Sequence, residues 1–443
     1  MSETKSYFYH ALNVNKDICL GCTHCIKSCP TEAIRIKNGK AEITDNKCID
    51  CGECLKSCSV NAIHIKQDDF DSLNNYKYRI ALVPAIFIGQ FDEKYKVSQI
   101  YSCLKDLGFT HIYEVEHGVG FLIDMVKKYM SSNTEQKFFI SSFCPAVIRL
   151  IQVRFSSLVK NIIHLKAPLD ISSYIVFQRL IDAGIKKEEI GIFYITPCAA
   201  KIAAVKSPVE KHPSPIHGVI NMDFLYNKVR LMLNNSKSIT EPINHNLVGR
   251  DVLWSLTGGE AKNFQGRCFA IDGVKNVIDF LEKIENEEIE PTGLIEMRVC
   301  NQSCAGGVLN SNNRFAAMER LRKRAIYLDK SNSKNITTSL SPEFYNKIES
   351  MMEIEAIKPR SILKLDDNIQ KALEMMEKIK KTERLLPDVD CGICGAPSCA
   401  AFAEDIGRNI AQIEDCVFFE KENYEEFSKK IKEIWGNREI LKK

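Results

Sequence analysis

Two dense clusters of cysteines near the N-terminus constrain this chain more than any other feature. The segment Cys19-Leu-Gly-Cys-Thr-His-Cys-Ile-Lys-Ser-Cys-Pro30 returns 29 residues later as Cys48-Ile-Asp-Cys-Gly-Glu-Cys-Leu-Lys-Ser-Cys-Ser59. The first ten residues hold no apolar core, so we expect no secretory signal and a cytoplasmic location. In such a reducing compartment, the 18 cysteines of the chain predict metal ligation or redox chemistry rather than a disulfide framework.

The spacing within each copy is C-x2-C-x2-C-x3-C, in which three thiolates hold one 4Fe–4S cubane and the fourth reaches a second cubane. This crossing rule assigns the first cluster to Cys19, Cys22, Cys25 and Cys58. It assigns the second cluster to Cys29, Cys48, Cys51 and Cys54. Paired zinc sites are the alternative, although zinc motifs seldom carry four cysteines this close together twice. The segment resembles a bacterial two-cluster ferredoxin, from which Ser59 departs because a proline is usual there.

The middle of the chain alternates between short apolar runs and amphipathic stretches such as Val274–Ile284. The runs that indicate buried strands begin at Tyr78, Lys137, Gly191 and Gly293. This alternation predicts an α/β core. Three cysteines, Cys144, Cys198 and Cys300, each follow the carboxyl end of a predicted strand, which is the edge where ligands sit in open α/β sheets. Their shared placement favours a ligand set over buried packing residues.

Three motifs surround these cysteines: Ser142-Phe-Cys-Pro145, Thr196-Pro-Cys-Ala-Ala-Lys201 and Glu296-Met-Arg-Val-Cys-Asn-Gln-Ser-Cys-Ala-Gly-Gly307. In this order they resemble the signature segments of the FeFe-hydrogenase catalytic domain. The resemblance implies an H-cluster, in which a 4Fe–4S cubane is joined through one cysteine to a diiron unit with CO and CN ligands. The implied ligands are Cys144, Cys198, Cys300 and Cys304. It further implies that Cys304 is the bridging thiolate, that Lys201 donates a hydrogen bond to a cyanide, and that dihydrogen and protons are the substrates.

Departures from the family pattern indicate what this site can do. Fast hydrogenases carry a second cysteine before the cubane ligand, and that thiol passes protons between the diiron unit and a glutamate-lined relay. Phe143 occupies this position and neither accepts nor donates a proton. The predicted helix Gly118–Met130 contains Asp124 but no pair of relay glutamates. The other departures are Thr196, Arg298 and Ala204, where the family has methionine, methionine and glutamate.

All four cysteine ligands are retained while their surroundings change, and such surroundings tune a cluster without deciding whether it binds. We therefore expect slow dihydrogen chemistry, which a Phe143→Cys variant should accelerate if the missing relay limits the rate. The alternative is that the chain binds only the cubane, as in hydrogenase-like iron–sulfur assembly proteins. In that case Arg298 fills the space that a cyanide would take.

A second cysteine-rich stretch lies at the C-terminal end, with spacing C-x2-C-x4-C-x16-C. Its members are Cys391, Cys394, Cys399 and Cys416. Glycines at 392 and 395 let the backbone pass close to a cluster, and the segment resembles a small 4Fe–4S domain of electron-transport subunits and sensory hydrogenases. A zinc site is the alternative. Cys103 and Cys268 remain unassigned, and we expect both to be buried structural thiols.

A helix is predicted between Asp366 and Glu383, with Asp366 or Asp367 as its N-cap. Ile369, Ala372, Leu373, Met376 and Ile379 form one apolar stripe along it. The stripe predicts a surface helix packed on the middle domain, and a coiled-coil homodimer or signalling helix is the alternative. A charged final helix is expected over 420–443.

The predicted organisation is an N-terminal tail (1–9), a two-cluster ferredoxin-like domain (10–70), an α/β hydrogenase-like domain (76–345), a helical linker (346–386) and a small helical 4Fe–4S domain (387–443). A net charge of +3 and the lack of an 18-residue apolar run predict neither nucleic-acid nor membrane binding. The layout resembles the sensory branch of the FeFe-hydrogenases. It implies a dihydrogen or redox sensor that passes electrons through accessory cubanes to a redox or signalling partner. A low-turnover metabolic hydrogenase and a non-catalytic electron-transfer or cluster-scaffold protein are the alternatives.

Overall fold

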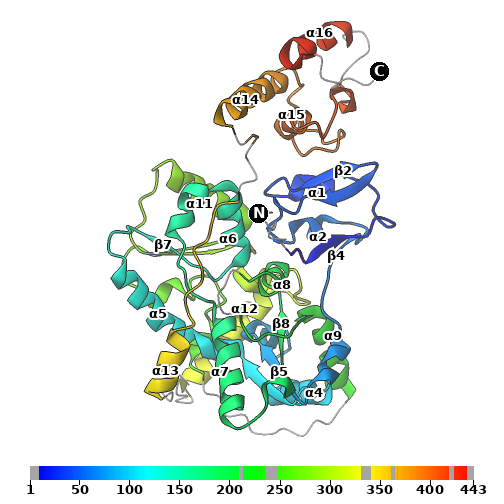
Figure 1. Cartoon of the computed structure of the whole chain (residues 1–443). Helices are drawn as coiled ribbons and strands as arrows, with labels where there is room; N and C mark the ends of the chain where they lie inside the picture. Colours follow the sequence, from blue (N-terminus) through cyan, green and yellow to red (C-terminus); the bar gives the residue numbers. More distant parts are fainter. Residues whose placement is uncertain are drawn as a thin grey trace. The chain divides into compact units, whose positions relative to one another are not determined.

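The computed structural model describes residues 9–208, 213–235, 247–330, 341–360, 365–366, 368–418 and 424–436 (Figure 1). Internal contacts divide the chain into two compact units. The larger comprises Ile65–Pro359, Ile49–Cys51 and the chain up to Ala11, and the smaller comprises Leu12–Cys48, Gly52–His64 and Arg360–Lys443. Within the described ranges, no helix combines the length and the apolar character needed to cross a membrane.

Two parallel sheets form the centre of the larger unit, which confirms the α/β class. The first has the order β6-β5-β8-β9 and the second the order β10-β11-β7. Their strands are β5 (Tyr78–Val83), β6 (His111–Glu114), β7 (Phe139–Ile140), β8 (Ile190–Thr196), β9 (Gly218–Asn221), β10 (Phe269–Asp272) and β11 (Leu294–Arg298). Every residue of β8 and β11 is buried, as expected for central strands of parallel sheets with both faces covered. Because the strands run parallel, their carboxyl ends meet at one edge of each sheet.

Helices follow most of these strands, as the alternation of the sequence predicts (Figure 1). They are α3 (Ala85–Gly89), α4 (Val97–Asp106), α5 (Val119–Ser132), α6 (Pro145–Arg154), α7 (Pro168–Asp182), α8 (Ala199–Lys206), α9 (Met222–Asn235), α10 (Gly249–Val252), α11 (Val274–Glu285), α12 (Arg314–Lys330) and α13 (Pro342–Glu349). In α11 the buried residues are Val277, Leu281 and Ile284, the face that helical periodicity predicts. Proline at the first position of α6 and α7 starts these helices directly after a loop.

The cysteine repeat folds as two similar halves in the smaller unit. Its elements are β1 (Leu12–Val14), α1 (His24–Ser28), β2 (Ile34–Lys37), β3 (Lys40–Ile43), α2 (Glu53–Ser57) and β4 (Ile63–Ile65). Strand β1 pairs with β4, and β2 pairs with β3. The two short helices meet where the Ser28 and Ser57 hydroxyls lie 3.0 Å apart. The sequence repeat is thus also a structural repeat.

The rest of the smaller unit is helical: α14 (Ile369–Glu383), α15 (Cys399–Gly407) and α16 (Tyr424–Trp435). They enclose a core that includes Phe402, Ile406 and Trp435. A buried ion pair, in which the Arg35 Nε donates to Asp405 Oδ2 at 2.5 Å, joins this core to β2. Of the charged stretch expected to be helical over 420–443, the described part contains α16, and the remainder lies outside the described residues.

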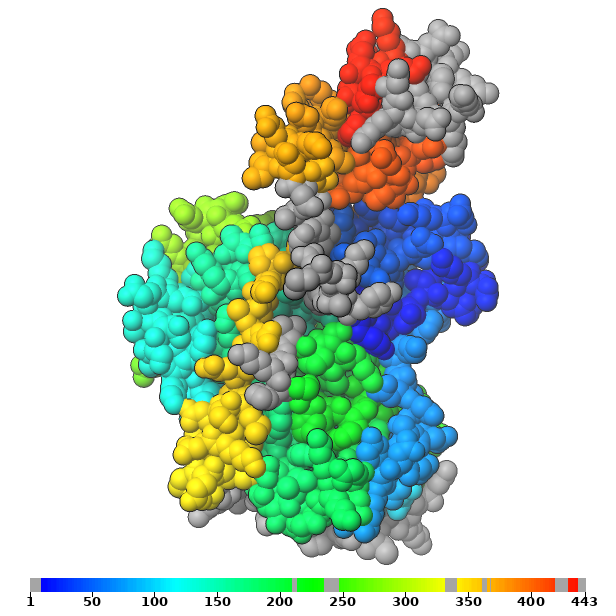
Figure 2. Space-filling view, in the orientation of Figure 1, coloured from blue at the N-terminus to red at the C-terminus, as the bar shows by residue number. Residues whose placement is uncertain are grey.

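Helix α14 confirms the predicted helix but corrects two of its details. Its N-cap is Asn368, whose side chain accepts from the N–H groups of Gln370 and Lys371, while Asp366 instead accepts from Asn368 N. Asp367 lies outside the described residues. Of the predicted stripe, Ile379 packs against the core together with Met375, whereas Ile369 and Leu373 are 78% and 59% exposed. Figure 2 shows α14 at the surface of this unit.

Candidate functional site

The three cysteines that follow predicted strands do lie at the carboxyl edges of the two sheets. Cys144 is the N-cap of α6 and Cys198 is the N-cap of α8. Cys300 follows β11 by two residues. The Thr196 hydroxyl donates to Cys198 O (3.0 Å) and accepts from Cys198 N (3.2 Å), so this departure from the family pattern fixes the turn that carries the ligand. A helix N-terminus presents free N–H groups that favour a negatively charged thiolate.

Cys304 reaches this edge because the third motif folds against the second. The backbone N–H of Leu309 donates to Pro197 O at 3.1 Å. A Cβ atom on Gly307 would lie 2.6 Å from the same carbonyl oxygen, so only glycine permits this approach. Gln302 and Ser303 have φ values of 66° and 53°, which turn the chain sharply before Cys304. The strand ends that carry Cys144 and Cys198 and the turn that carries Cys304 thereby converge.

The thiols of this edge influence one another electrostatically. Burial, together with the nearby Cys144 and Cys304, raises the pKa of Cys198 to about 12. Burial likewise raises the pKa of Cys304, which Lys201 and Arg298 oppose. Cys300 lies on the same turn as Cys304, and its carbonyl accepts from Ser303 N at 3.0 Å. Four sulfur donors, two of them at helix starts, fit a 4Fe–4S cubane, which binds cysteines as thiolates.

A small cavity of about 10 Å³ lies beside Cys304. That volume is room for about one water molecule. Its lining includes Glu116, Phe143, Lys201, Trp254, Ser255 and Cys304. Trp254 Nε1, Ser255 Oγ and Glu116 Oε2 are buried and have no hydrogen-bond partner among the described residues. Unsatisfied polar atoms around one cavity fit a polar occupant, although anything larger than water requires side chains of the lining to shift.

Phe143, at the position of the missing relay cysteine, is buried and contacts two cations. The Lys201 Nζ atom lies 4.3 Å from the centre of the ring, and the Arg298 Cζ atom lies 4.2 Å from it. Both contacts have cation–π geometry. Although burial opposes it, the hydroxyl of Tyr194 and the cysteine thiolates hold the pKa of Lys201 above its ordinary value. Lys201 therefore stays charged next to the cubane ligands.

Arg298 points into a buried carboxylate network and not into the cavity. Its Nη2 donates to Glu260 Oε2 at 2.7 Å and lies 3.8 Å from Glu296 Oε1. Glu260 also accepts from the Ser141 hydroxyl, and Glu296 accepts from three backbone N–H groups. In this structure Glu260 and Glu296 hold the guanidinium, and Arg298 is not among the residues that line the cavity beside Cys304.

The sequence reasoning missed Glu260 and Glu296, although one signal was available. Glu296 and Arg298 are two residues apart on β11, so their side chains share one face of the strand. A glutamate and an arginine on one face of a fully buried strand predict an ion pair. Glu260 has no comparable signal, because it approaches from a loop that is distant in sequence.

Glu116 is a second residue that the sequence reasoning missed. It lies just before the predicted helix Gly118–Met130, and its Oε1 accepts from Ala85 N at 2.8 Å. Burial and the neighbouring Glu114 raise the pKa of Glu116 to about 8. Burial acts in the same direction on Glu114, but Arg324, which donates to both of its oxygens, holds the pKa of Glu114 below its ordinary value.

The N-terminal cysteines lie close to one another, and Cys19, Cys22, Cys25 and Cys58 form one such group. Burial raises the pKa of Cys25 to about 11, and the contributing neighbours are Cys22, Cys19 and Cys58. Burial raises the pKa of Cys54 to about 12, with Cys29 as the first contributing neighbour. In this set Cys48 is buried and Cys51 half-buried. Each copy also contributes a backbone N–H to a ligand sulfur, from Ala33 to Cys29 and from Ala62 to Cys58, both at 3.2 Å.

The C-terminal cysteines also gather around one small cavity. It is lined by Cys391, Cys394, Cys399 and Cys416. Burial, together with the other three thiols, raises the pKa of Cys394 to about 11. Gly395 has φ +87°, and a Cβ there would lie 2.2 Å from Ile36 O, so the glycine is required for this close approach. This arrangement fits a fourth thiolate-bound cluster.

The two unassigned thiols differ from each other. Cys103 is buried on α4, as expected for a structural thiol. Cys268 is only half-buried, so the expectation for this residue is wrong. It directly precedes β10, an edge strand that is partly open to solvent.

These features define an iron–sulfur protein with cysteine sets in both units. Residues 77–226 match the family model "Iron only hydrogenase large subunit, C-terminal domain". Residues 11–59 match "4Fe-4S dicluster domain", and 386–418 match "Putative Fe-S cluster". Residues 77–226 are therefore similar to the C-terminal domain of the iron-only hydrogenase large subunit, and the cysteine-rich segments on either side are similar to iron–sulfur domains. The hydrogenase match includes Cys144 and Cys198 and ends before the third motif.

Similar proteins were also found among curated sequences and solved structures. An uncharacterized protein of Methanocaldococcus jannaschii is 34% identical over 68 residues, which are 15% of this chain and 30% of that protein. The chain thus spans less than a third of this relative. The FeFe-hydrogenase HydA(deltaEFG) has a TM-score of 0.49 at 13% identity, covering 66% of this chain and 97% of that one. A variant of FeFe-hydrogenase HydA1 from Chlamydomonas reinhardtii has a TM-score of 0.48 at 12% identity, covering 65% and 95%.

Proposed function

We propose that this chain is a sensor of dihydrogen or of cellular redox state, with an H-cluster site that turns over slowly. The observation that carries the proposal is Phe143. An aromatic ring stands where a proton-carrying thiol is expected, and it packs against Lys201 and Arg298. A ring held by two buried cations neither takes up a proton nor moves aside easily. A sensor needs only to equilibrate with its signal, so slow exchange suits it.

The cubane of this site would be held by Cys144, Cys198, Cys300 and Cys304, and a diiron unit would share Cys304. Lys201 and the unsatisfied atoms of Glu116, Trp254 and Ser255 are the polar groups available to such a unit. When bound, the diiron unit supplies reversible dihydrogen oxidation. The residues of the chain orient it, keep bulk water out and restrict proton movement.

Three further cubanes, two in the ferredoxin-like segment and one at the C-terminal cysteines, would carry electrons to or from a partner. The partner is a soluble redox or signalling protein that reads their oxidation state. A cluster that changes charge on reduction biases whichever partner conformation pairs better with that charge. The chain itself would supply a path for electrons, and proton exchange at the H-cluster end of that path would be slow.

Maturation of the purified chain with a synthetic diiron precursor tests the proposal. Infrared bands of bound carbonyl and cyanide are expected, together with dihydrogen turnover below the common enzyme range of roughly 1–1000 per second. Bands together with rapid turnover contradict the sensor role and favour a metabolic hydrogenase. A Cys304→Ser variant, which removes the proposed bridge, is the control that should lose the bands.

A second candidate is an electron-transfer protein that holds only the cubane at this site. The cavity of about 10 Å³ beside Cys304 favours it, since that space accommodates one water and not a diiron unit. In this case the matured chain shows no carbonyl or cyanide bands, while its four cubanes remain detectable by electron paramagnetic resonance.

A further inference from the structure

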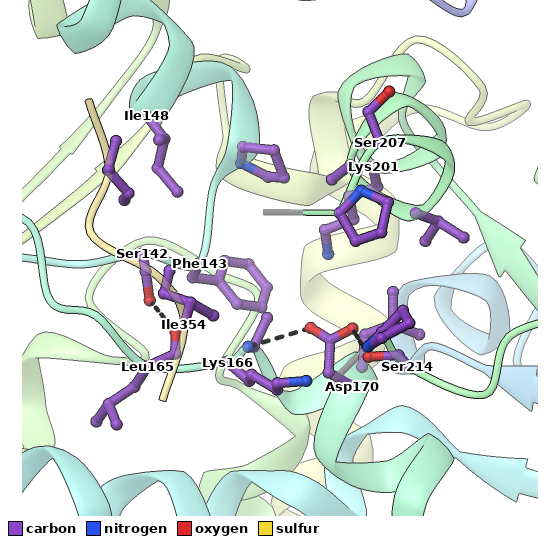
Figure 3. A pocket seen from close by; sticks show the side chains of 18 of the residues that line it. Ser142, Phe143, Ile148, Leu165, Lys166, Asp170, Lys201, Ser207, Ser214 and Ile354 are labelled. Carbon is purple, nitrogen blue, oxygen red and sulfur yellow. Dashed lines mark hydrogen bonds between the residues drawn. The ribbon is translucent and has the colours of Figure 1, made fainter. Parts of the chain in front are cut away.

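Phe143 and Lys201 also line a second and larger cavity, of about 160 Å³. Its walls come from the start of α6, the start of α7, α8 and the loops near them. Figure 3 shows Lys201 pointing into this space, with Phe143 beside it and Asp170 and Lys166 across the cavity. Because the same two side chains line both cavities, they form the partition between the larger cavity and the cluster site.

Most of the wall of the larger cavity is apolar. Ile148, Leu169, Val205 and Ile216 are among the side chains that form it. An apolar cavity of about 150 Å³ is large enough to hold one benzene ring. The space therefore suits a ligand with a compact apolar body of about that size, and it is too small for a nucleotide or a flavin.

The charged groups of the cavity differ in whether they are already paired. Arg149 forms an ion pair with Asp50. Asp170 accepts from the Ser214 hydroxyl at 2.6 Å and from Ala167 N at 3.3 Å. Burial raises the pKa of Asp170, and the positive charge of Lys166 opposes this rise. Lys166 donates to the Tyr174 hydroxyl at 3.2 Å. These groups therefore already have partners.

Lys201 is the exception. It is 9% exposed and contacts the Phe143 ring, but its ammonium has no hydrogen-bond acceptor among the residues that the structure describes. An ammonium carries three N–H donors, so it can serve a group on each side of the partition. Buried polar groups without partners are rare, and one that faces a cavity indicates a ligand that supplies the acceptor.

We propose that this cavity binds a small monocarboxylate with an apolar body of about the size of benzene. The carboxylate accepts from Lys201, and Ile148, Leu169, Val205 and Ile216 surround the body. A phosphate or a dicarboxylate fits less well, because such anions need several converging donors and the wall is mainly apolar.

The ligand would also tune the cubane, a step that rests on the cubane assignment of the proposed function but not on the diiron unit. Lys201 lines the small cavity beside Cys304, and a positive charge there favours the added electron of the reduced cluster. A carboxylate on Lys201 offsets that charge, so it lowers the reduction potential. By linkage, reduction of the cubane weakens carboxylate binding by the same factor.

Isothermal titration of the full chain, with its cubanes assembled and no diiron unit added, tests the site. Benzoate is the probe and benzamide is its neutral counterpart. One benzoate per chain is expected, binding at least tenfold more tightly than benzamide. Val205→Phe, which fills the cavity, should abolish binding, and Ala204→Phe is a second filling variant should the first fail to fold. Lys201→Met should remove the preference for benzoate over benzamide, and Lys160→Met, an exposed lysine away from this cavity, is its matched control and should bind normally.

Absence of benzoate binding, equal binding of benzamide, or unchanged binding in a correctly folded filling variant overturns the site. Titration of oxidised and dithionite-reduced protein tests the coupling. A tenfold weaker affinity of the reduced form corresponds to a downward shift of about 59 mV for a one-electron couple. Equal affinity in both redox states overturns the coupling and leaves the binding site in place. Neither result depends on whether the infrared test of the diiron unit succeeds.

Discussion

The cysteines of the N-terminal repeat and those at the sheet edges lie in different kinds of surroundings. In the repeat, both copies reproduce even the backbone donors, since Ala33 and Ala62 each donate to a ligand sulfur at 3.2 Å. At the sheet edge, the four cysteines that we propose as cluster ligands have Phe143, Arg298 and a buried carboxylate pair as neighbours. Cysteine ligands therefore have the same backbone environment in both copies of the repeat, whereas those at the sheet edges have neighbours that depart from the family pattern.

The difference teaches that cluster binding and cluster reactivity are specified by separate residues. Ligands closely spaced in sequence are nearly enough to hold a cubane. Reactivity depends on charged and polar side chains around the cluster, and some of these, such as Glu116 and Glu260, come from distant segments. A chain can therefore keep its cofactor while changing what the cofactor does.

The largest effect should come from removing a single ligand at the sheet edge. Cys198→Ser should eliminate the cubane of this site and reduce the iron content from about 16 to about 12 atoms per chain, at four per cubane. The clusters of the repeat should persist, because their predicted ligands all come from the repeat and not from the sheet edges. Iron analysis and electron paramagnetic resonance measure this. Loss of all clusters in a folded variant would show that the two regions do not assemble independently.

Breaking the buried ion pair should be the next largest effect. Arg298→Met leaves Glu260 and Glu296 buried without their cation, so we expect a loss of about 3–5 kcal/mol of unfolding free energy. The matched control is Arg154→Met, whose pair with Glu282 is exposed and should cost no more than about 1 kcal/mol. Urea unfolding of both variants measures the difference. Equal losses of unfolding free energy would mean that the buried carboxylate network contributes no more to stability than an exposed ion pair.

Glu116 should make stability depend on pH. Its pKa of about 8 in the folded chain lies above the ordinary 4.5, so the folded state keeps a proton that the unfolded state releases between these values. Stability therefore falls as the pH rises from about 4.5 to about 8. Glu116→Gln removes this dependence. Its advantage in unfolding free energy over the unchanged chain should therefore be about 1–3 kcal/mol larger at pH 8.5 than at pH 5.

Thermal unfolding of this variant at both pH values checks the prediction. The exposed Glu135→Gln serves as the control and should show no such difference. A constant stability gain at both pH values would contradict the assigned titration.

The smallest effect should come from restoring the relay cysteine alone. Phe143 packs in an apolar cluster with Leu122 and Ile123, and its ring contacts two cations. A thiol in its place completes only one step of a proton path, so Phe143→Cys should raise dihydrogen turnover by less than about tenfold, short of the 100- to 10,000-fold typical of a positioned proton carrier. Phe143→Ala is the control for lost packing. A gain of a hundredfold or more would show that the missing thiol is the sole limit.

Much of the fold was predictable, because period-2 and period-3.6 patterns and cysteine spacing are local properties of the sequence. The α/β alternation, the repeat and the helix α14 are of this kind. The side chains that surround the clusters were harder to predict from the sequence. Glu260 reaches Arg298 across 38 positions of the sequence, and Lys201 reaches Phe143 across 58. Tertiary contacts between such distant residues leave no periodic signal, and the exposed face of α14 likewise depends on which side its neighbours cover.

The infrared spectrum of the chain after maturation with a synthetic diiron precursor tests the central proposal most directly. We predict carbonyl and cyanide bands that shift when argon is replaced by dihydrogen, in a protein whose steady turnover stays slow. Such shifts would show a site that responds to its signal without sustaining flux. The absence of these bands, in a sample whose cubanes are intact, would contradict the proposal of a dihydrogen-responsive H-cluster.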